Sequence, residues 1–546
     1  MKARAPLLVM TLLFYCLWTS VSLGEVSFAR ILGADREPEN WLTYSGTTFS
    51  QRYSRLTQIT PANVKNLELQ WVYQAQSLEK FEATPLVVDG IMYTVQAPND
   101  VIALDAATGR IFWTYSHHPE HGRPCCGRVN RGLAILGDTL FLGTLDAHLI
   151  AIDAKSGHPI WETTVASARS AYAITHAPLV IKNEVVVGTG GGEFGIRGFI
   201  AAYDVHTGKE IWRFNTVPGP GKPGHETWAG DSWQTGGAPV WTTGSYDPVL
   251  NLTYWGVGNP SPDWNGDVRP GDNLYSDSVV ALDADTGNLK WYYQFTPHDE
   301  FDYDAAQVPV LADMEWHGKL RKVMLWANRN GFFYVLDRTT GQFLMGKPFV
   351  KVTWANGFDE MGRPSLVSGK TPSTEGTLIY PGNPGGTSWY SPSYSPRTGL
   401  FYIPAWANSS SIFVKAPAEY KEGRNYAGGT TRSSVPFNWS PAPNFRKEQE
   451  GYGAVRAVDP KTGEKKWEFK MADVTEAGIL TTASDLLFSG GREGYFYALD
   501  ARNGALLWKA ALGAAVISGP MTYSVAGRQY VAVNAGNCLF TFALRQ

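Results

Sequence analysis

The stretch Val101-Ile-Ala-Leu-Asp105-Ala-Ala-Thr-Gly109-Arg-Ile-Phe-Trp113 contains the pattern that decides the fold. An apolar strand runs into a Thr-Gly turn, and a second strand follows that ends in tryptophan. Glycine supplies the positive φ that a tight hairpin needs, and the aspartate can accept hydrogen bonds from the amides of the turn. The indole offers a large apolar surface that can pack between neighbouring sheets. We therefore interpret this stretch as two adjacent strands of a small antiparallel sheet.

The same spacing occurs seven times: aspartate, glycine four residues later, and tryptophan or once methionine eight residues after the aspartate. The sets are Asp105/Gly109/Trp113, Asp153/Gly157/Trp161, Asp204/Gly208/Trp212, Asp283/Gly287/Trp291, Asp337/Gly341/Met345, Asp459/Gly463/Trp467 and Asp500/Gly504/Trp508. Repeats of roughly 40–50 residues built from short strands and tight turns are typical of β-propellers, in which only the closed ring buries the face of every unit. The sequence predicts an all-β propeller with one blade per repeat.

An eighth blade is predicted from the two ends of the chain. Residues 520–523, 528–533 and 539–544 have the composition of three strands without a fourth, whereas residues 67–73 resemble a lone outer strand with its own tryptophan. Pairing these segments closes a ring of eight blades and removes the exposed edges that an open sheet must protect. The long gaps that precede Asp283 and Asp459 indicate functional or capping loops.

Length, composition and charge limit the possible partners, the number of domains and the location of the protein. The chain has 546 residues, 44% of them hydrophobic, and a net charge of −3, which argues against a nucleic-acid partner. Lys2 and Arg4 precede an apolar run and then small residues up to Gly24, which is the order of a secretory signal peptide; an uncleaved anchor is the alternative. We predict a signal peptide over 1–24, one propeller domain over 25–546 and a periplasmic location, since no low-complexity linker interrupts the repeats.

The adjacent cysteines Cys125 and Cys126 lie in a stretch that departs from the repeat. Neighbouring Cα atoms are about 3.8 Å apart, below the usual disulfide range of about 4.4–6.8 Å, so a bond between them would form a small strained ring. An exported protein can keep such a bond, and strain of this kind is tolerated mostly where it serves a site. Two reduced thiols are the alternative.

A glycine-rich segment and an acidic segment also depart from the repeat. Gly190, Gly192 and Gly195 match a dinucleotide-binding pattern, but a further strand follows instead of the helix that this pattern requires, so we reject a nicotinamide site. In the acidic segment 298–304, a strand period of two places Asp302 and Asp304 on one side. Burying these carboxylates without a cation would be costly, and a solvated acidic turn is the alternative.

Taken together, these motifs resemble those of the pyrroloquinoline quinone (PQQ)-dependent alcohol dehydrogenases, an eight-bladed quinoprotein family that includes methanol and ethanol dehydrogenases. The resemblance covers the chain after the signal segment. It rests on the repeat, on Cys125-Cys126-Gly-Arg-Val-Asn-Arg131-Gly, Gly191-Gly-Glu193, Gly258-Asn259-Pro and Thr296-Pro-His-Asp-Glu-Phe-Asp302. It implies oxidation of a primary alcohol to the aldehyde, with hydride passing to the metal-polarised quinone and electrons leaving to a separate acceptor, a soluble cytochrome c or a membrane quinone. The sequence has no Cys-x-x-Cys-His motif, so we expect no attached haem.

The resemblance also implies which residues hold the cofactor. The expected contacts are Glu82, Cys125, Cys126, Arg131, Thr175, Gly191, Gly192, Trp241 and Arg329. A disulfide between the two cysteines would lie on one face of the quinone, and Trp241 would stack on the other. Arg131 is the natural bidentate partner of a cofactor carboxylate.

The metal ligands that the resemblance implies are Glu193, Asn259, Asp302 and Asp304. Asp302 matches the catalytic base, and Arg329 matches the arginine beside the quinone oxygens. In the family, calcium enzymes usually have a small residue two positions after the catalytic aspartate, whereas lanthanide-dependent members have a second aspartate there. A trivalent cation is hard and one charge richer than calcium, so Asp304 predicts one lanthanide ion in preference to Ca²⁺.

Two positions depart from the family pattern, and two alternative functions stay open. A tryptophan that some methanol dehydrogenases place near the cofactor aligns with Glu476, and an expected asparagine contact has no counterpart between Trp389 and Asn408. One alternative is a PQQ-dependent sugar or polyol dehydrogenase, and the other is a non-catalytic propeller scaffold such as an outer-membrane assembly factor. The alcohol, the electron acceptor and the oligomeric state, a homodimer included, stay open.

Overall fold

The computed structural model describes residues 24–119, 124–435 and 450–545. Helix is scarce among them: the one α-helix is α1 (Phe28–Leu32), and the 3-10 segments η1 to η7 have three or four residues each. None of these helices could cross a membrane. The signal segment predicted over 1–24 lies almost wholly outside the described residues, so it and the domain boundaries stay predictions.

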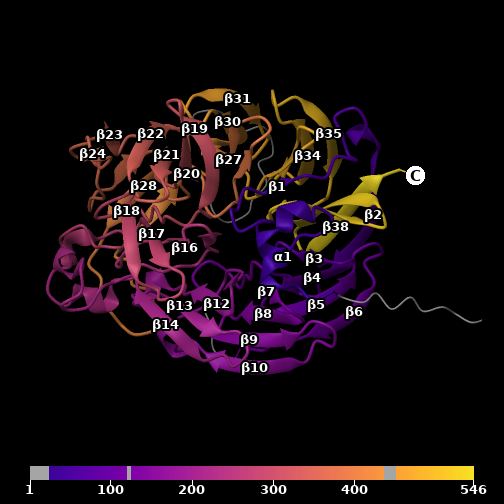
Figure 1. Ribbon diagram of the computed structural model, residues 1–546. Coiled ribbons are helices and arrows are strands. Elements are labelled where there is room, and N and C mark those ends of the chain that lie inside the picture. The colour runs from indigo at the N-terminus through magenta and orange to yellow at the C-terminus, as the bar shows by residue number, and fades with distance from the viewer. Residues whose placement is uncertain (1–23, 120–123, 436–449, 546) are drawn as a thin grey trace, which may run out of the picture.

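Eight antiparallel sheets stand around a ring in the order of the chain (Figure 1). Blade 1 contains β3 (Leu86–Val88), β4 (Ile91–Gln96), β5 (Asp100–Asp105) and β6 (Ile111–Tyr115). Blade 2 contains β7 (Ala134–Leu136), β8 (Thr139–Gly143), β9 (His148–Asp153) and β10 (Pro159–Thr164). Blade 3 contains β11 (Leu179–Ile181), β12 (Glu184–Gly188), β13 (Phe199–Asp204) and β14 (Glu210–Asn215). Blade 4 contains β15 (Ser245–Asp247), β16 (Leu252–Gly256), β17 (Ser278–Asp283) and β18 (Leu289–Gln294).

The second half of the ring repeats this order with insertions. Blade 5 contains β19 (Val310–Trp316), β20 (Lys319–Ala327), β21 (Phe332–Asp337) and β22 (Phe343–Pro348). Blade 6 contains β26 (Ser393–Ser395), β27 (Leu400–Ala407), β30 (Tyr452–Val458) and β31 (Lys465–Lys470). Blade 7 contains β32 (Leu480–Thr482), β33 (Leu486–Gly490), β34 (Tyr495–Asp500) and β35 (Leu506–Ala511). The long gap before Asp459 forms two small sheets, from β23 (Ala355–Phe358), β24 (Pro364–Leu366), β25 (Thr377–Ile379), β28 (Ser411–Lys415) and β29 (Gly429–Ser433).

Blade 8 is shared between the two ends of the chain, as predicted. It contains β36 (Met521–Val525), β37 (Arg528–Ala535), β38 (Cys538–Leu544) and, as the outer strand, β2 (Leu67–Gln74). The pairing of β2 with β38 is antiparallel, from Leu67 opposite Leu544 to Gln74 opposite Cys538. A second link, β1 (Tyr53–Ser54), pairs in parallel with β32 of blade 7. Indigo and yellow strands therefore lie side by side in Figure 1, and the predicted eight-bladed ring is confirmed.

The repeated tryptophan and glycine form one contact between neighbouring blades. Trp113 of blade 1 covers Gly157 of blade 2 so closely that a Cβ on this glycine would lie 2.5 Å from the indole. The indole N–H of Trp113 donates to the carbonyl of Ala154, at 3.1 Å. The equivalent pairs are Trp71 on Gly109, Trp161 on Gly208, Trp212 on Gly287, Trp291 on Gly341 and Trp467 on Gly504. The first of these crosses the seam where β2 closes the ring.

Methionine takes the place of tryptophan at one contact, between blades 5 and 6. A Cβ on Gly463 would lie 2.6 Å from Cγ of Lys347 and 3.4 Å from Cε of Met345. The aliphatic stem of a lysine therefore covers the glycine that an indole covers elsewhere. The last tryptophan, Trp508 of blade 7, instead packs edge-on against Phe542 of blade 8, with ring centroids 5.3 Å apart.

The repeated aspartate closes the hairpin that precedes each docking tryptophan. Asp105 Oδ1 accepts hydrogen bonds from the amides of Ala107 and Thr108, at 2.9 and 3.0 Å. At the equivalent turn, hydrogen bonds from Thr207, its hydroxyl first, hold the pKa of Asp204 below its usual range. Gly109 has φ +74°, the left-handed conformation that the hairpin requires. The predicted roles of aspartate and glycine in the turn are confirmed.

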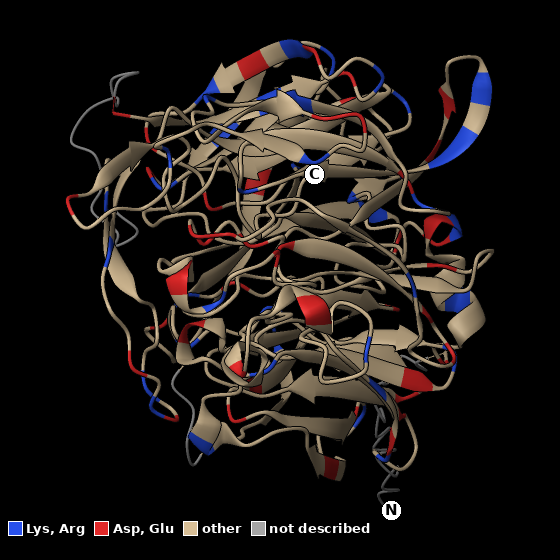
Figure 2. Ribbon diagram, turned by 90° about the vertical axis from the view of Figure 1, so that its left-hand side faces the viewer, with Lys and Arg blue, Asp and Glu red and all other residues tan. Residues whose placement is uncertain are grey.

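Burial falls from the inner to the outer strands of a blade. Most residues of β12 and β13 are buried, whereas most residues of the outer strand β14 are partly or fully exposed. Lys and Arg alternate with Asp and Glu over the ribbon, without an extended region of one sign (Figure 2). This agrees with the net charge of −3.

Replacing a docking tryptophan should reduce stability. For Trp113→Ala we expect the free energy of unfolding to fall by roughly 3 kcal/mol, because the partly buried indole leaves a void at the blade interface. The measurement is urea unfolding followed by circular dichroism. Phe112→Ala, at an exposed position of the same strand, is the matched control and should cost less than about 1 kcal/mol. Equal losses in the two variants would contradict the proposed docking role.

Candidate active site

Two aspartates and one arginine meet on the connections of blades 4 and 5. Asp302 and Asp304 precede β19, and Arg329 follows β20. Arg329 Nη2 lies 3.1 Å from Asp302 Oδ2, and Arg329 Nη1 contacts Asp304 Oδ2. Asp304 Oδ1 accepts a hydrogen bond from the backbone amide of Asn259, at 2.8 Å, on the loop that follows β16. The structure therefore brings together four of the residues that the sequence assigns to catalysis and metal binding.

Two oxygens of this cluster are buried without a hydrogen-bond partner among the described residues: Asn259 Oδ1 and Asp302 Oδ1. The amide nitrogen of Asn259 donates to Asp263 Oδ1, at 2.8 Å, and this bond fixes the direction of the free oxygen. An unsatisfied buried oxygen costs about 1–3 kcal/mol, whereas coordination of a hard cation satisfies it. A Cβ on Gly192 would lie 2.7 Å from the free oxygen of Asn259, so this close approach needs glycine.

Carboxyl groups crowd around these oxygens, and each opposes the ionisation of the others. Burial, followed by repulsion from Asp302 and Asp304, raises the pKa of Glu193 to about 8. Burial is also the main cause that raises the pKa of Asp302 to about 7; Asp304 raises it further, and Arg329 opposes the rise. The buried carboxyl of Asp263 has a pKa well above its usual range for the same two reasons. Arg329 offsets this effect only in part, and a bound cation would favour the ionised carboxylates further.

The vicinal disulfide lies beside the acidic cluster. Cys125 and Cys126 are bonded to each other with their Cα atoms 3.8 Å apart, so the alternative of two reduced thiols is wrong for this structure. Both sulfur atoms and a carboxylate oxygen of Glu193 lie within 4.8 Å of one another. The disulfide and the acidic cluster therefore belong to one site.

Arg131 organises the other half of the site. Its Nη2 lies 2.9 Å from Glu82 Oε2, and its Nη1 donates to Thr175 Oγ1 at 3.1 Å. The guanidinium lies 5.2 Å from the ring centroid of Trp241 and 4.5 Å from that of Trp389. The indole N–H of Trp241 is 3.4 Å from Asp304 Oδ1, which joins this half to the acidic cluster.

The glycine-rich loop passes close to its neighbours. Gly191 has φ +117°, and a Cβ there would lie 2.5 Å from the carbonyl oxygen of Ala171. Gly192 begins the 3-10 turn η4 (Gly192–Phe194), which carries Glu193. A side chain at either glycine would displace the loop, so the glycines set the position of the Glu193 carboxylate.

The sequence analysis missed Asn383. Its Nδ2 donates to Asp302 Oδ2 at 2.8 Å, and its backbone carbonyl accepts from Arg329 Nη2 at 2.7 Å. It therefore holds both catalytic candidates in place. Asn383 lies in the long insertion between β25 and β26, before the range from Trp389 to Asn408. The available signal was Gly382-Asn383-Pro384, which repeats the Gly258-Asn259-Pro260 motif.

Two basic side chains hold Glu476, which stands where some methanol dehydrogenases have tryptophan. Lys80 Nζ lies 2.9 Å from its Oε2, and Arg492 Nε lies 3.4 Å from its Oε1. Its charge is also among the causes that raise the pKa of Glu82, of which burial is the largest. An ion-pair network therefore occupies this edge of the site instead of an aromatic ring.

A family model described as "Glucose/ethanol/alcohol dehydrogenase, beta-propeller domain" matches residues 41–356, which contain all the candidate site residues named from the sequence. The chain belongs to the PQQ-dependent alcohol dehydrogenase family. The dehydrogenase is 40% identical to quinohemoprotein alcohol dehydrogenase ADH IIB of Pseudomonas putida, over 96% of this chain and 78% of the relative. It is 36% identical to quinoprotein alcohol dehydrogenase PedH of Pseudomonas putida, over 98% of this chain and 92% of the relative.

Solved structures agree with this assignment. A europium-containing methanol dehydrogenase superposes on the dehydrogenase with a TM-score of 0.88 and 33% identity, covering 94% of this chain and 100% of that one. A second family model, that of the outer membrane protein assembly factor BamB, matches residues 451–543. This segment contains repeat strands and none of the catalytic or metal-binding candidates, so the match reflects the blade repeat. The dehydrogenase is an oxidoreductase, and the scaffold interpretation is not supported.

Buried His176, next to Thr175, should make the stability of the dehydrogenase sensitive to acid. Its Nδ1 donates to the carbonyl of Ala177 at 2.9 Å, and its Nε2 accepts from the amide of Gly188 at 3.0 Å. These bonds require a neutral ring, and burial lowers its pKa from 6.5 to about 4. As the pH falls, His176 is protonated in the unfolded chain before it is protonated in the folded one. The contribution of the neutral ring to stability is therefore fully present above pH 6.5 and is lost as the pH drops toward about 4.

Urea unfolding at pH 7 and pH 5 measures this effect. We expect the wild type to lose about 2 kcal/mol more than His176→Gln over this interval. His206→Gln, at an exposed turn position, should follow the wild type. A loss in His176→Gln as large as in the wild type would rule out the buried ring as its cause.

Proposed function

We propose that this protein oxidises a primary alcohol to its aldehyde in the periplasm, with PQQ as the cofactor. One metal ion would be held by Glu193, Asn259, Asp302 and Asp304. The observation that carries the proposal is the pair of buried, unpartnered oxygens on Asn259 and Asp302. They lie in a cluster whose carboxyl pKa values are raised by burial and mutual repulsion. Such a cluster suits a bound cation.

The donors of the site fit both groups. The four candidate metal ligands offer only carboxylate and amide oxygens, which hard cations prefer. Arg131 presents a guanidinium close to two indole rings, which suits a flat ligand that carries carboxylates. When bound, PQQ supplies an electrophilic carbonyl that accepts hydride from the alcohol.

Asp302 is proposed as the general base. Its Oδ2 is fixed by Arg329 and by the side-chain amide of Asn383, whereas its Oδ1 has no partner among the described residues. The free oxygen can take the hydroxyl proton of the alcohol, which requires hydrogen-bond reach to that proton. Arg329 holds Asp302 and can stabilise negative charge that develops beside it. Asn383 is a positioning residue, since it acts through Asp302 and Arg329.

The proposed metal is a lanthanide in preference to Ca²⁺. Asp304 is 3% exposed, and both of its oxygens face the cluster through Asn259 and Arg329. This second carboxylate adds the negative charge that a trivalent ion needs for balance. The similar solved methanol dehydrogenase contains europium, a lanthanide, which supports the choice.

The electron acceptor and the location complete the proposal. We propose a separate acceptor, a soluble cytochrome c before a membrane quinone, because the sequence lacks a haem attachment motif. Export through the segment 1–24 would place the enzyme in the periplasm, where the disulfide can persist.

Asp302→Asn should abolish turnover while cofactor and metal stay bound. The amide cannot accept the alcohol proton as a carboxylate does, so we expect kcat to fall by about 10²–10⁴-fold. The measurement is dye-linked oxidation of ethanol by the holoenzyme, together with the PQQ and metal content of each preparation. Asp267→Asn, an exposed aspartate, is the control. A variant that keeps both groups and full turnover would exclude Asp302 as the base.

Asp304→Asn and Asp304→Ala should discriminate between metals. Apoprotein reconstituted with PQQ and either Ca²⁺ or La³⁺ is assayed in parallel, and we expect La³⁺ to give the higher turnover in the wild type. Both variants should lose La³⁺-dependent activity more than Ca²⁺-dependent activity, since each removes one charge. Asparagine keeps an acceptor for the amide of Asn259, so it separates charge from shape. Equal or better wild-type turnover with Ca²⁺ would refute the lanthanide preference.

A further inference from the structure

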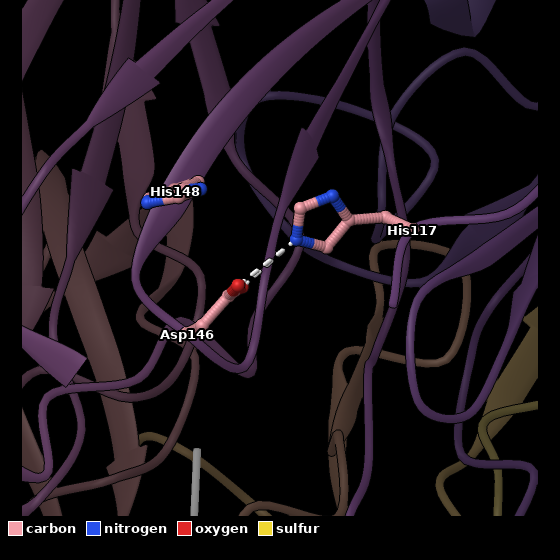
Figure 3. A group of neighbouring side chains, drawn as sticks. All are labelled: His117, Asp146 and His148. Atoms are coloured by element: carbon pink, nitrogen blue, oxygen red, sulfur yellow. Dashed lines mark hydrogen bonds and ion pairs between the residues drawn. The ribbon is translucent and has the colours of Figure 1, made fainter. Parts of the chain in front are cut away.

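A second group of metal-ligating side chains lies outside the acidic cluster, where blade 1 meets blade 2. His117 follows β6 of blade 1, Asp146 lies in the turn between β8 and β9 of blade 2, and His148 begins β9. The imidazole of His117 points at the carboxylate of Asp146, and His148 lies on the adjoining strand (Figure 3). His117 Nε2 is 3.1 and 3.0 Å from the two oxygens of Asp146. One ligand atom from each of the three residues lies within 4.8 Å of the others.

We propose that His117, Asp146 and His148 bind one Zn²⁺ ion. Zinc binds imidazole nitrogen and carboxylate oxygen at about 2.0–2.2 Å, so small side-chain movements can bring the three atoms around one centre. Two imidazoles and one carboxylate favour Zn²⁺ over the hard cations that all-oxygen sites prefer. Water completes a tetrahedral set. The site therefore differs in chemistry from the oxygen cluster at Asn259 and Asp302.

Each blade 2 ligand has a neighbour that can orient it. Thr144 Oγ1 donates to Asp146 Oδ1 at 2.5 Å. His148 Nδ1 is 2.6 Å from Glu162 Oε1, and its Nε2 is 3.2 Å from Thr164 Oγ1. Nδ1 has no hydrogen-bond partner among the described residues, so it can bind the metal while Nε2 donates to Thr164. Such outer partners fix the tautomer and direction of metal-ligating histidines.

The burial of the group also fits a metal site. The side chains of His117 and Asp146 are 14% and 7% exposed, and that of His148 is 27% exposed. The two imidazole rings approach edge to face, with centroids 5.9 Å apart. A simple ion pair between His117 and Asp146 would leave the buried Nδ1 of His148 beside it without a hydrogen-bond partner. The three-residue arrangement therefore favours an ion over a pair.

A metal here would join blades 1 and 2 at the start of the connection that carries the cysteine pair. The chain that leaves β6 through His117 carries Cys125 and Cys126 and then Arg131 before it enters blade 2. Coordination would fix the start of this connection to the β8–β9 turn. We infer a structural role for the ion, since no substrate-binding candidate touches it.

Isothermal titration of Zn²⁺ into the full-length protein tests the proposal. The protein is stripped of metal, kept oxidised so that the cysteines stay paired, and saturated with Ca²⁺ to occupy the oxygen cluster. We expect one Zn²⁺ per chain in the wild type and a loss of affinity of about tenfold or more in His117→Ala and in His148→Ala. His158→Ala, an exposed histidine in the next turn of blade 2, is the matched control and should bind as the wild type does.

Thermal denaturation keeps the test decisive if a variant is less stable. A ligand that binds only the folded state raises the melting temperature, and the increase grows with the ratio of ligand concentration to Kd. Zn²⁺ should therefore raise the melting temperature of the wild type and of His158→Ala. Neither ligand variant should respond. Anomalous scattering at the zinc edge should then place the ion between the three side chains. The proposal fails if the wild type takes up no more Zn²⁺ than a His117→Ala/His148→Ala double variant.

Discussion

The contact of an indole with the glycine of the next blade is the interaction on which the ring depends. Each blade is a small sheet that cannot bury both of its faces alone, and the glycine lets the neighbouring ring approach within van der Waals distance. The indole N–H then satisfies a carbonyl at the same interface, as Trp113 does with Ala154. Because this contact recurs at most of the blade interfaces, the angle between those blades is set locally.

The active site depends on that closure because its residues come from different blades. Glu82 precedes blade 1, Arg131 precedes blade 2, and Arg329 follows the second strand of blade 5. Each lies on a connection where the repeat is interrupted, so the scaffold fixes the strand ends and leaves the connections free to carry chemistry. The crowding of carboxyl groups around Asp302 would destabilise an isolated loop. The rigid ring holds these groups together, and a cation can offset their repulsion.

The fold could be predicted from the sequence because its signals are local. Asp105, Gly109 and Trp113 lie within one hairpin, and seven copies of that hairpin fix the repeat. The pairing of β2 with β38 followed from a strand missing at one end and an unpaired strand at the other.

The site was predictable only in part. The disulfide, Asp302 and Arg329 stand in motifs that resemble those of the family, and the structure brings them together. Asn383 stands in a second Gly-Asn-Pro motif, but its role, like that of Trp389, depends on contacts with residues far away in the sequence. The pairing of His117 with Asp146 was missed for the same reason, since the two residues lie on different blades.

The shared blade 8 has a consequence for the order of assembly. The outer strand β2 precedes blade 1 in the chain, yet its partner β38 is among the last segments to be synthesised. Until β38 is in place, β2 has no strand partner, and the faces of blades 1 and 7 that blade 8 covers stay open. An unpaired strand can pair with another chain. Closure of the ring therefore requires the C-terminal strands, because β38 supplies the partner of β2. A chain that lacked these last strands would keep its first outer strand unpaired, so truncation at the C-terminus would affect the start of the ring as well as its end.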